Sequence, residues 1–303
     1  MIAIVMLQLE QFSGSNKPLK YLMMDSNTHG GDNMIYFADE EELKKQLTGL
    51  KLSDYPNWIK FKLTTSKEYE MFVGTEDNMY TLKVSKYYSH WEYSLFDFIG
   101  YEESYNKNII LHITAADFEQ AKKKYKNHHF KETQIRDYEA EVLVHSTPWE
   151  SWEKIQTDGT LKSWHTLKQK NPDFEAEPIG KQLGDPENYS HYIMFSNGHV
   201  ASEIVVLSRQ SGYIDMDQDK AYQTGARLYF DMNAIAQDGL LVRDGAHLKV
   251  KNELPLKKYL IWVGTWKSVG LENQISTPLE FTTKANHVFN ELHGKNYQLL
   301  LNP

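Results

Sequence analysis

The sequence contains no cysteine. This absence excludes disulfide frameworks, thiolate nucleophiles, iron–sulfur clusters and zinc sites built from cysteine. Long apolar runs are also missing. The apolar stretch 1–7 is short, and no basic segment precedes it. We therefore expect neither a signal peptide nor a membrane span, and we predict a cytoplasmic location.

Positive charge is scarce as well. Lysine and arginine number 33 against 41 aspartates and glutamates, which gives a formal net charge of −8. A protein that coats nucleic acid needs a net positive charge to displace counterions. A general nucleic-acid coat is therefore excluded and DNA binding is not expected, while a local basic groove stays open.

Aromatic residues, by contrast, are plentiful. The 303 residues include 7 Trp, 19 Tyr and 13 Phe, spread along the chain, so most of it can bury a core. This length fits one large domain or two modest ones. The stretch 126–139 is polar and shows no apolar period, and we place a boundary there. The sequence thus predicts a smaller α+β N-terminal module at 1–137 and a larger domain at 138–303.

Short strands, turns and two helices are predicted in the N-terminal module. Glycines and polar residues between apolar runs favour hairpins, and a hydroxyl or acidic residue before a helical period favours a helix start. The aromatic stretch 87–98 is interpreted as a core strand or a capping segment. The predicted elements are a strand at 1–7, hairpins within 21–37 and 70–84, a helix beginning at Asp39 and ending at Gly49, a strand at 109–113, and a helix capped by Thr114 that runs to Lys124.

A strand followed by an amphipathic helix opens the second half. The apolar run 142–147 contains His145 and Thr147 at its end, and the helix after it stops at Gly159. A histidine in such a place can donate through one ring nitrogen to a ligand while the backbone holds the other. His145 and Thr147 are therefore candidate binding residues, and the alternative for His145 is a purely structural role.

Another strand, 191–196, ends in the small hydroxyl residue Ser196. The loop 180–190 before it does not match a nucleotide P-loop. The ring of Tyr192 in this strand is suited to stack on a flat cationic ring. Ordinary strand alternation explains the same residues without a ligand, so both interpretations stay open.

A third segment combines a strand, a short helix and an arginine. The strand 227–230 meets Asp231, which is expected to cap a helix that stops at Gly239. The strand after it ends in Arg243, and a last strand is expected to run to Val263. An arginine can pair with a phosphate through two hydrogen bonds, which a lysine does not reproduce, and the alternative is a surface salt bridge.

The order of these pieces resembles the ADP-ribosyltransferase fold, a split β-sheet domain. Within it, the run 228–260 is most similar to the RNA 2′-phosphotransferase family. Along the chain, the consensus of that family is a strand, an Asp, a short helix, an Asp-Gly pair, a strand with an arginine, and the motif Pro-Pro-Lys-Tyr. The resemblance covers about 141–263. Arg243 matches the arginine of the family, and Asp238 with Gly239 matches its Asp-Gly pair. His145 and Thr147 match the first and last residues of its His-Gly-Thr motif.

The resemblance implies that NAD is a substrate, attacked at the carbon that joins nicotinamide to ribose, and that no metal is needed. Such a site has to hold the dinucleotide, stack the departing nicotinamide and stabilise charge. The implied catalytic residues are Arg243, Asp244 and Tyr192, and the implied NAD-binding residues are His145, Ser146, Thr147, Tyr192 and Ser196.

The sequence also departs from these families. Two basic motifs of the phosphotransferases, expected before the His145 strand, are absent, and the place of a classical catalytic glutamate holds Ala246. Three hypotheses follow. The first is an NAD-dependent ADP-ribosyltransferase, a toxin or modifier whose N-terminal module selects a protein or RNA acceptor. The second is an RNA 2′-phosphotransferase-like enzyme, and the third a non-catalytic binding protein on the same fold.

Overall fold

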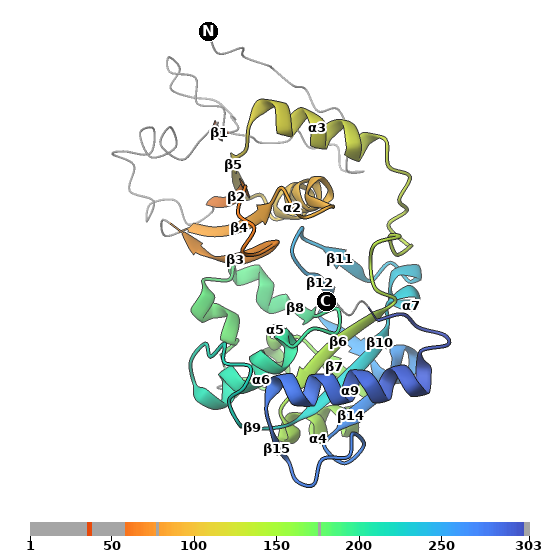
Figure 1. Cartoon of the computed structure of the whole chain (residues 1–303). Coiled ribbons are helices and arrows are strands. Elements are labelled where there is room, and N and C mark those ends of the chain that lie inside the picture. The colour runs from red at the N-terminus through yellow and green to blue at the C-terminus, as the bar shows by residue number, and fades with distance from the viewer. Residues whose placement is uncertain (1–34, 38–57, 77–78, 175–176, 300–303) are drawn as a thin grey trace. The chain divides into compact units, whose positions relative to one another are not determined.

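The computed structural model describes residues 35–37, 58–76, 79–174 and 177–299 (Figure 1). These residues form two compact units. The first contains the described residues up to His128 together with Arg243–Ala246, and the second contains His129–Val242 and the described residues from His247 onward. The second unit thus begins within the polar stretch 126–139. The strand predicted at 1–7, the helix predicted between Asp39 and Gly49, and most of the hairpin predicted within 21–37 lie outside the described residues.

A five-stranded mixed sheet forms the centre of the first unit. Its order is β1-β5-β2-β4-β3, in which β3 and β4 are antiparallel and the other neighbours are parallel. The hairpin predicted at 70–84 is therefore confirmed. The strands are β1 (Ile35–Phe37), β2 (Trp58–Thr64), β3 (Met71–Glu76), β4 (Met79–Ser85) and β5 (Asn108–His112).

Among the described residues of the first unit, two helices accompany this sheet, α2 (Trp91–Ser104) and α3 (Ala115–Lys126). The strand predicted within 87–98 is wrong, because most of that stretch belongs to α2. Its buried residues Trp91, Leu95 and Phe98 recur at helical spacing, a period that the many aromatic side chains obscure in the sequence. The cap predicted for α3 is confirmed, since the Thr114 side chain accepts a hydrogen bond from the backbone N–H of Asp117.

Two three-stranded sheets organise the second unit, in the orders β14-β10-β6 and β11-β12-β8. Two short strand pairs, β13 with β7 and β15 with β9, complete it. The strands are β6 (Val142–Thr147), β7 (Thr160–Lys162), β8 (Tyr192–Phe195), β9 (Tyr222–Gln223), β10 (Ala226–Asp231), β11 (Leu241–Arg243), β12 (Leu248–Lys251), β13 (Glu253–Pro255), β14 (Leu260–Thr265) and β15 (Ile275–Ser276).

The helices of the second unit begin and end largely where the capping signals predict. Gly159 ends α4 in the left-handed conformation, with φ 65°, and the Asp231 side chain accepts from the Ala234 N–H at the start of α7. Thr277 caps α9, its side chain accepting a hydrogen bond from the Glu280 N–H. The helices are α4 (Trp149–Asp158), α5 (Trp164–Lys170), α6 (Ala201–Ser211), α7 (Met232–Gln237), α8 (Leu256–Tyr259) and α9 (Pro278–His293), with 3₁₀ turns η2 (Ile179–Leu183) and η3 (Glu187–His191).

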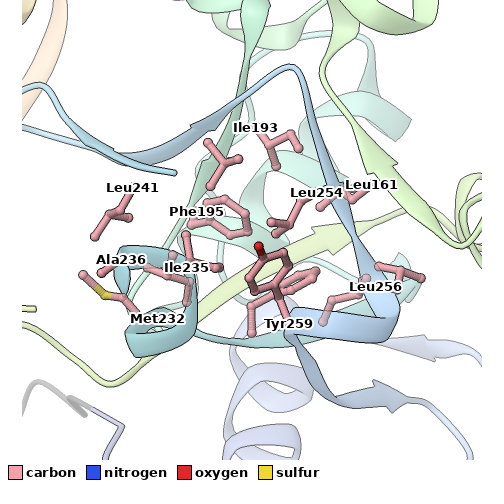
Figure 2. Close-up of a cluster of buried hydrophobic side chains, with 14 of the residues drawn as sticks. Leu161, Ile193, Phe195, Met232, Ile235, Ala236, Leu241, Leu254, Leu256 and Tyr259 are labelled. Atoms are coloured by element: carbon pink, nitrogen blue, oxygen red, sulfur yellow. The ribbon is translucent and has the colours of Figure 1, made fainter. Parts of the chain in front are cut away.

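Apolar side chains lie on both faces of the β14-β10-β6 sheet, so the second unit has two cores. Leu228 and Phe230 of β10 belong to one core, shown in part in Figure 2, and Tyr229 between them belongs to the other. The second core packs α9 against the sheet through Phe281 and Phe289. The α+β class is therefore confirmed. No helix in the described part of the chain is both long and apolar enough to cross a bilayer.

Gly225 marks a close approach between two backbone segments of the second unit. A Cβ atom added at Gly225 would lie 1.8 Å from the carbonyl oxygen of Thr147 and 2.8 Å from its carbonyl carbon. Because these are backbone atoms of β6, no side-chain rotation relieves the clash. We expect Gly225→Ala to lower the free energy of unfolding by about 1–3 kcal/mol, measured by urea denaturation.

Gly100→Ala is the matched control, since an added Cβ at Gly100 of α2 meets nothing within 4 Å. Alanine there is expected to stabilise the helix by up to about 1 kcal/mol. Equal unfolding midpoints for Gly225→Ala and the unchanged protein would contradict the close approach.

Candidate functional site

The candidate site lies where β6 and β8 meet in the second unit. The two strands are joined by an isolated bridge, in which Val144 and Ser196 exchange two backbone hydrogen bonds of 2.8 Å. Next to the bridge, His145 Nδ1 lies 2.9 Å from the carbonyl oxygen of Met194. The imidazole of His145 therefore lies at the junction of the two sheets.

The partner of His145 determines what this side chain can do. Burial lowers the pKa of His145 to about 4, and the charge of Arg209 contributes in the same direction. The imidazole is consequently neutral at pH 7. Since the Met194 carbonyl can only accept, Nδ1 carries the proton and Nε2 presents a lone pair. His145 is thus an acceptor for a ligand hydroxyl, rather than the donor that we expected from the sequence.

Arg209 is a cation whose charge acts on His145 and which the sequence analysis missed. Arg209 lies in the last turn of α6. The residue as a whole is exposed, but removal of its guanidinium from water lowers the pKa of Arg209. No carboxylate of the described residues lies within ion-pair distance of it. A guanidinium near a neutral histidine can bind a phosphate or carboxylate of a ligand. A lone arginine on an amphipathic helix gives no sequence signal for this.

Ser146 points to the opposite side of β6 and belongs to a buried polar cluster. Its hydroxyl donates to Glu203 Oε1, and the hydroxyl of Tyr222 donates to Glu203 Oε2 at 2.6 Å. Burial and the adjacent carboxylate raise the pKa of Tyr222 far above its usual range. The predicted NAD-binding residue Ser146 therefore holds a buried glutamate.

Arg227 balances the charge of Glu203 and is itself fully buried, with 0% exposure. Its Nη1 donates to Glu203 Oε1 at 3.2 Å and to the Ser202 hydroxyl at 2.8 Å, and its Nε donates to the Tyr229 hydroxyl at 3.1 Å. Its Nη2 donates to the Gly198 carbonyl at 2.7 Å. Each nitrogen of the guanidinium thus has an acceptor, as a buried charge requires.

Asn286 connects α9 to the same cluster. Its side-chain N–H donates to the Gly198 carbonyl at 2.8 Å, and its Oδ1 accepts from the Tyr229 hydroxyl at 2.8 Å. Gly198 has φ 95°, which a residue with a Cβ adopts only with strain. Arg227 and Asn286 therefore fix the turn that follows Ser196, the residue bridged to β6.

Two further predicted residues lie at this junction. Thr147 ends β6 and is 3% exposed, and the Ser196 hydroxyl donates to the Ser202 hydroxyl at 3.2 Å. His145, Ser146, Thr147 and Ser196 are thus brought together, with Ser146 and Ser196 bound into the polar cluster.

Tyr192 is close in sequence but already faces a cation. The ammonium of Lys249 lies 4.8 Å from the centroid of the Tyr192 ring and 3.8 Å from that of Tyr189, and Lys249 is fully buried. Cation–π attraction of this kind is stronger when the cation is removed from water. The ring that we expected to stack on nicotinamide therefore contacts a lysine of this chain.

Strand β11 begins in the second unit, but its last residue, Arg243, and the following Asp244 are grouped with the first unit. The segment Arg243–Ala246 belongs to the first unit, whereas His145 belongs to the second, so the structure does not define one site that contains both. The Asp244 carboxylate accepts from the Ala246 N–H at 2.9 Å and forms a tight turn. A local structural role is thus assigned to Asp244.

No protein-family model, curated protein or solved structure matches this chain. The site is therefore characterised by its own chemistry. Among the described residues, no group of three His, Asp or Glu side chains is arranged to hold a metal ion. Within the described part of the chain, the junction offers a neutral imidazole acceptor, small hydroxyl residues and the charge of Arg209, which has no carboxylate partner there.

Removing only one partner of the buried ion pair should strongly lower the free energy of unfolding. Arg227→Met leaves the Glu203 carboxylate buried without a cation, and we expect a loss of about 3–5 kcal/mol in the free energy of unfolding. The double variant Arg227→Met/Glu203→Met removes both charges and should lose less than the sum of the two single variants, measured by urea denaturation as a double-mutant cycle. Strict additivity would show that the two side chains do not interact.

His145 should make stability depend on pH. Its pKa is near 6.5 in an unfolded chain and about 4 in the folded protein, so the unfolded state binds more protons between these values. The contribution of the neutral imidazole is therefore fully present above pH 6.5 and is lost as the pH falls toward 4.

We expect the stability difference between the unchanged protein and His145→Asn to shrink over this window, measured by urea denaturation at several pH values. His287→Asn, at an exposed position of α9, is the control and should show no such trend. A difference that stays constant from pH 7 to 4.5 would contradict the lowered pKa.

Proposed function

We propose that the second unit is an NAD-dependent ADP-ribosyltransferase-like enzyme that modifies a macromolecular acceptor. The proposal rests on one observation above all: a neutral His145, held through Nδ1 by the Met194 carbonyl, presents an acceptor at the junction of two sheets with the charge of Arg209 nearby. The order of strand, His-x-Thr, helix and glycine supports the ADP-ribosyltransferase fold, as does the presence of two separate three-stranded sheets in the second unit.

The residues of the junction fit a dinucleotide in a simple way. The Nε2 lone pair of His145 would accept a hydrogen bond from a ribose hydroxyl, which orients the sugar. Arg209 would pair with a phosphate, the role that we assigned to Arg243 from the sequence. NAD would supply the glycosidic bond that breaks. Transfer through an oxocarbenium-like transition state needs orientation and charge stabilisation more than a covalent partner.

The rigid surroundings of the junction support this role. Ser146, Glu203 and Arg227 hold β6 against α6 and against the turn after β8. Groups held in place before a ligand binds lose little entropy on binding and act from fixed positions. The polar cluster would therefore position the site and is not assigned to contact NAD.

A second candidate function, ligand binding without transfer, is favoured by two observations. Ala246 occupies the place of the glutamate in the classical family, and Lys249 contacts the ring of Tyr192. A protein of this kind would bind NAD or a related nucleotide and release no nicotinamide.

The test is an assay of nicotinamide release from NAD, combined with the shift in melting temperature that NAD causes. His145→Ala and Arg209→Gln should each reduce release and NAD affinity roughly ten- to a hundredfold, the cost of a lost hydrogen bond to a charged or tightly held group. The melting temperature without NAD should change little for Arg209→Gln, and the shift that NAD causes in His145→Ala is compared with the melting temperature of that variant without NAD. His287→Ala and Lys267→Gln, at exposed positions of the same unit, are the controls.

The outcomes separate the candidates. Release that depends on His145 and Arg209 supports the transferase, and a shift in melting temperature without release supports the binding protein. Loss of phosphate from 2′-phosphorylated RNA would favour the phosphotransferase. The absence of both release and any shift would contradict the proposed NAD site.

A further inference from the structure

Lysine and tyrosine side chains gather over three adjoining segments of the first unit. The end of β2 contacts the segment before α2, because the Lys86 N–H donates to the Thr64 carbonyl at 2.8 Å. That segment contacts α3, because Lys124 Nζ donates to the Ser89 carbonyl at 3.2 Å. We name this region the lysine–tyrosine surface and define it by Lys67, Lys86, Tyr87, Lys123, Lys124 and Lys126.

An exposed ring lies in the lysine–tyrosine surface. Tyr87 is 59% exposed, and Lys67 Nζ lies 4.9 Å from its ring centroid. Close by, the ring of Tyr93 stacks on that of His128 with a centroid distance of 6.0 Å, and Lys124 Nζ lies 5.1 Å from the Tyr93 centroid. Aromatic rings alternating with cations form the arrangement on which unpaired nucleic-acid bases stack.

The charge of the lysine–tyrosine surface is positive despite the net charge of the chain. Two carboxylates form ion pairs with lysines of this surface. Asp117 pairs with Lys86 at 2.5 Å, and the buried Glu92 pairs with Lys124 at 2.8 Å. Glu68, beside Lys67, is an exposed acid. Lys67 and Lys123 are exposed, and among the described residues neither has a carboxylate within ion-pair distance. A local positive field of this kind attracts a polyanion even when the protein as a whole is acidic.

We propose that the lysine–tyrosine surface binds single-stranded nucleic acid. Lys67 and Lys123 would contact phosphates, and a base would stack on Tyr87. An acidic peptide would use the lysines but would not need the exposed ring, and a duplex keeps its bases stacked on one another. The proposal goes beyond the NAD-dependent function, because this surface needs neither NAD nor any residue of the second unit.

Binding of a fluorescein-labelled oligonucleotide to the full chain tests the proposal by fluorescence anisotropy. The probes are an RNA and a DNA of the same mixed sequence, about 12 nucleotides long, a length that one small binding module can cover. We expect Tyr87→Ala to weaken binding roughly tenfold without changing its salt dependence. Lys67→Ala/Lys123→Ala should weaken binding and reduce the slope of log affinity against log salt by about 1.4.

The matched control is Lys267→Ala/Lys295→Ala, which removes two exposed lysines of the second unit and should bind as the unchanged protein does. Preference for the RNA or for the DNA identifies the physiological source, and either supports the proposal. It is overturned if neither oligonucleotide binds at low salt, or if the control pair loses as much affinity. It is also overturned if polyglutamate displaces the probe and Tyr87→Ala has no effect, because the surface then recognises acidic protein. This assay does not measure nicotinamide release. A negative result here would overturn the nucleic-acid proposal and would leave the proposed NAD site unaffected.

Discussion

The buried pairing of Arg227 with Glu203 is the constraint on which the rest of the second unit depends. Two charges removed from water are stable only if each is paired and its remaining hydrogen-bonding groups are satisfied. Arg227 on β10 meets this requirement through Glu203 and Ser202 on α6, the Gly198 carbonyl and Tyr229. One residue of β10 therefore holds a helix and a turn at once.

The position of His145 follows from this constraint. Ser146, its neighbour on β6, is held by Glu203, and Ser196 on the bridge to β8 is bound to Ser202. Successive residues of a strand point to opposite faces, so fixing Ser146 on one side directs His145 to the other. There the Met194 carbonyl sets its tautomer, and its second nitrogen is left as an acceptor. A structural ion pair and a candidate binding group thus occupy adjacent residues.

Local signals in the sequence predict much of this fold. The β6 strand, the stop of α4 at Gly159 and the Asp231 cap of α7 are each encoded by a few neighbouring residues, and all three are confirmed. Of the two interpretations of 87–98, a core strand or a capping segment, the strand is wrong, because aromatic residues are common in strands and hide the helical period of α2.

The site was harder to predict, because its partners are distant in sequence. Arg227 bonds to Glu203 across 24 positions and Asn286 to Gly198 across 88, and no local pattern reports such a contact. Family resemblance pointed to His145 and Thr147, which do lie at the sheet junction. It also pointed to Tyr192 and Arg243, of which the first contacts Lys249 and the second falls in the other unit.

The central claim is that His145 is a neutral imidazole with a free acceptor nitrogen, which we propose contacts NAD. Nitrogen-15 NMR of the histidine side chains at pH 7 tests it most directly, with His145→Asn used to assign the signals. The account predicts a proton on Nδ1, none on Nε2, and an Nε2 resonance that moves when NAD is added. A proton on Nε2, or a His145 signal that NAD leaves unchanged, would contradict it.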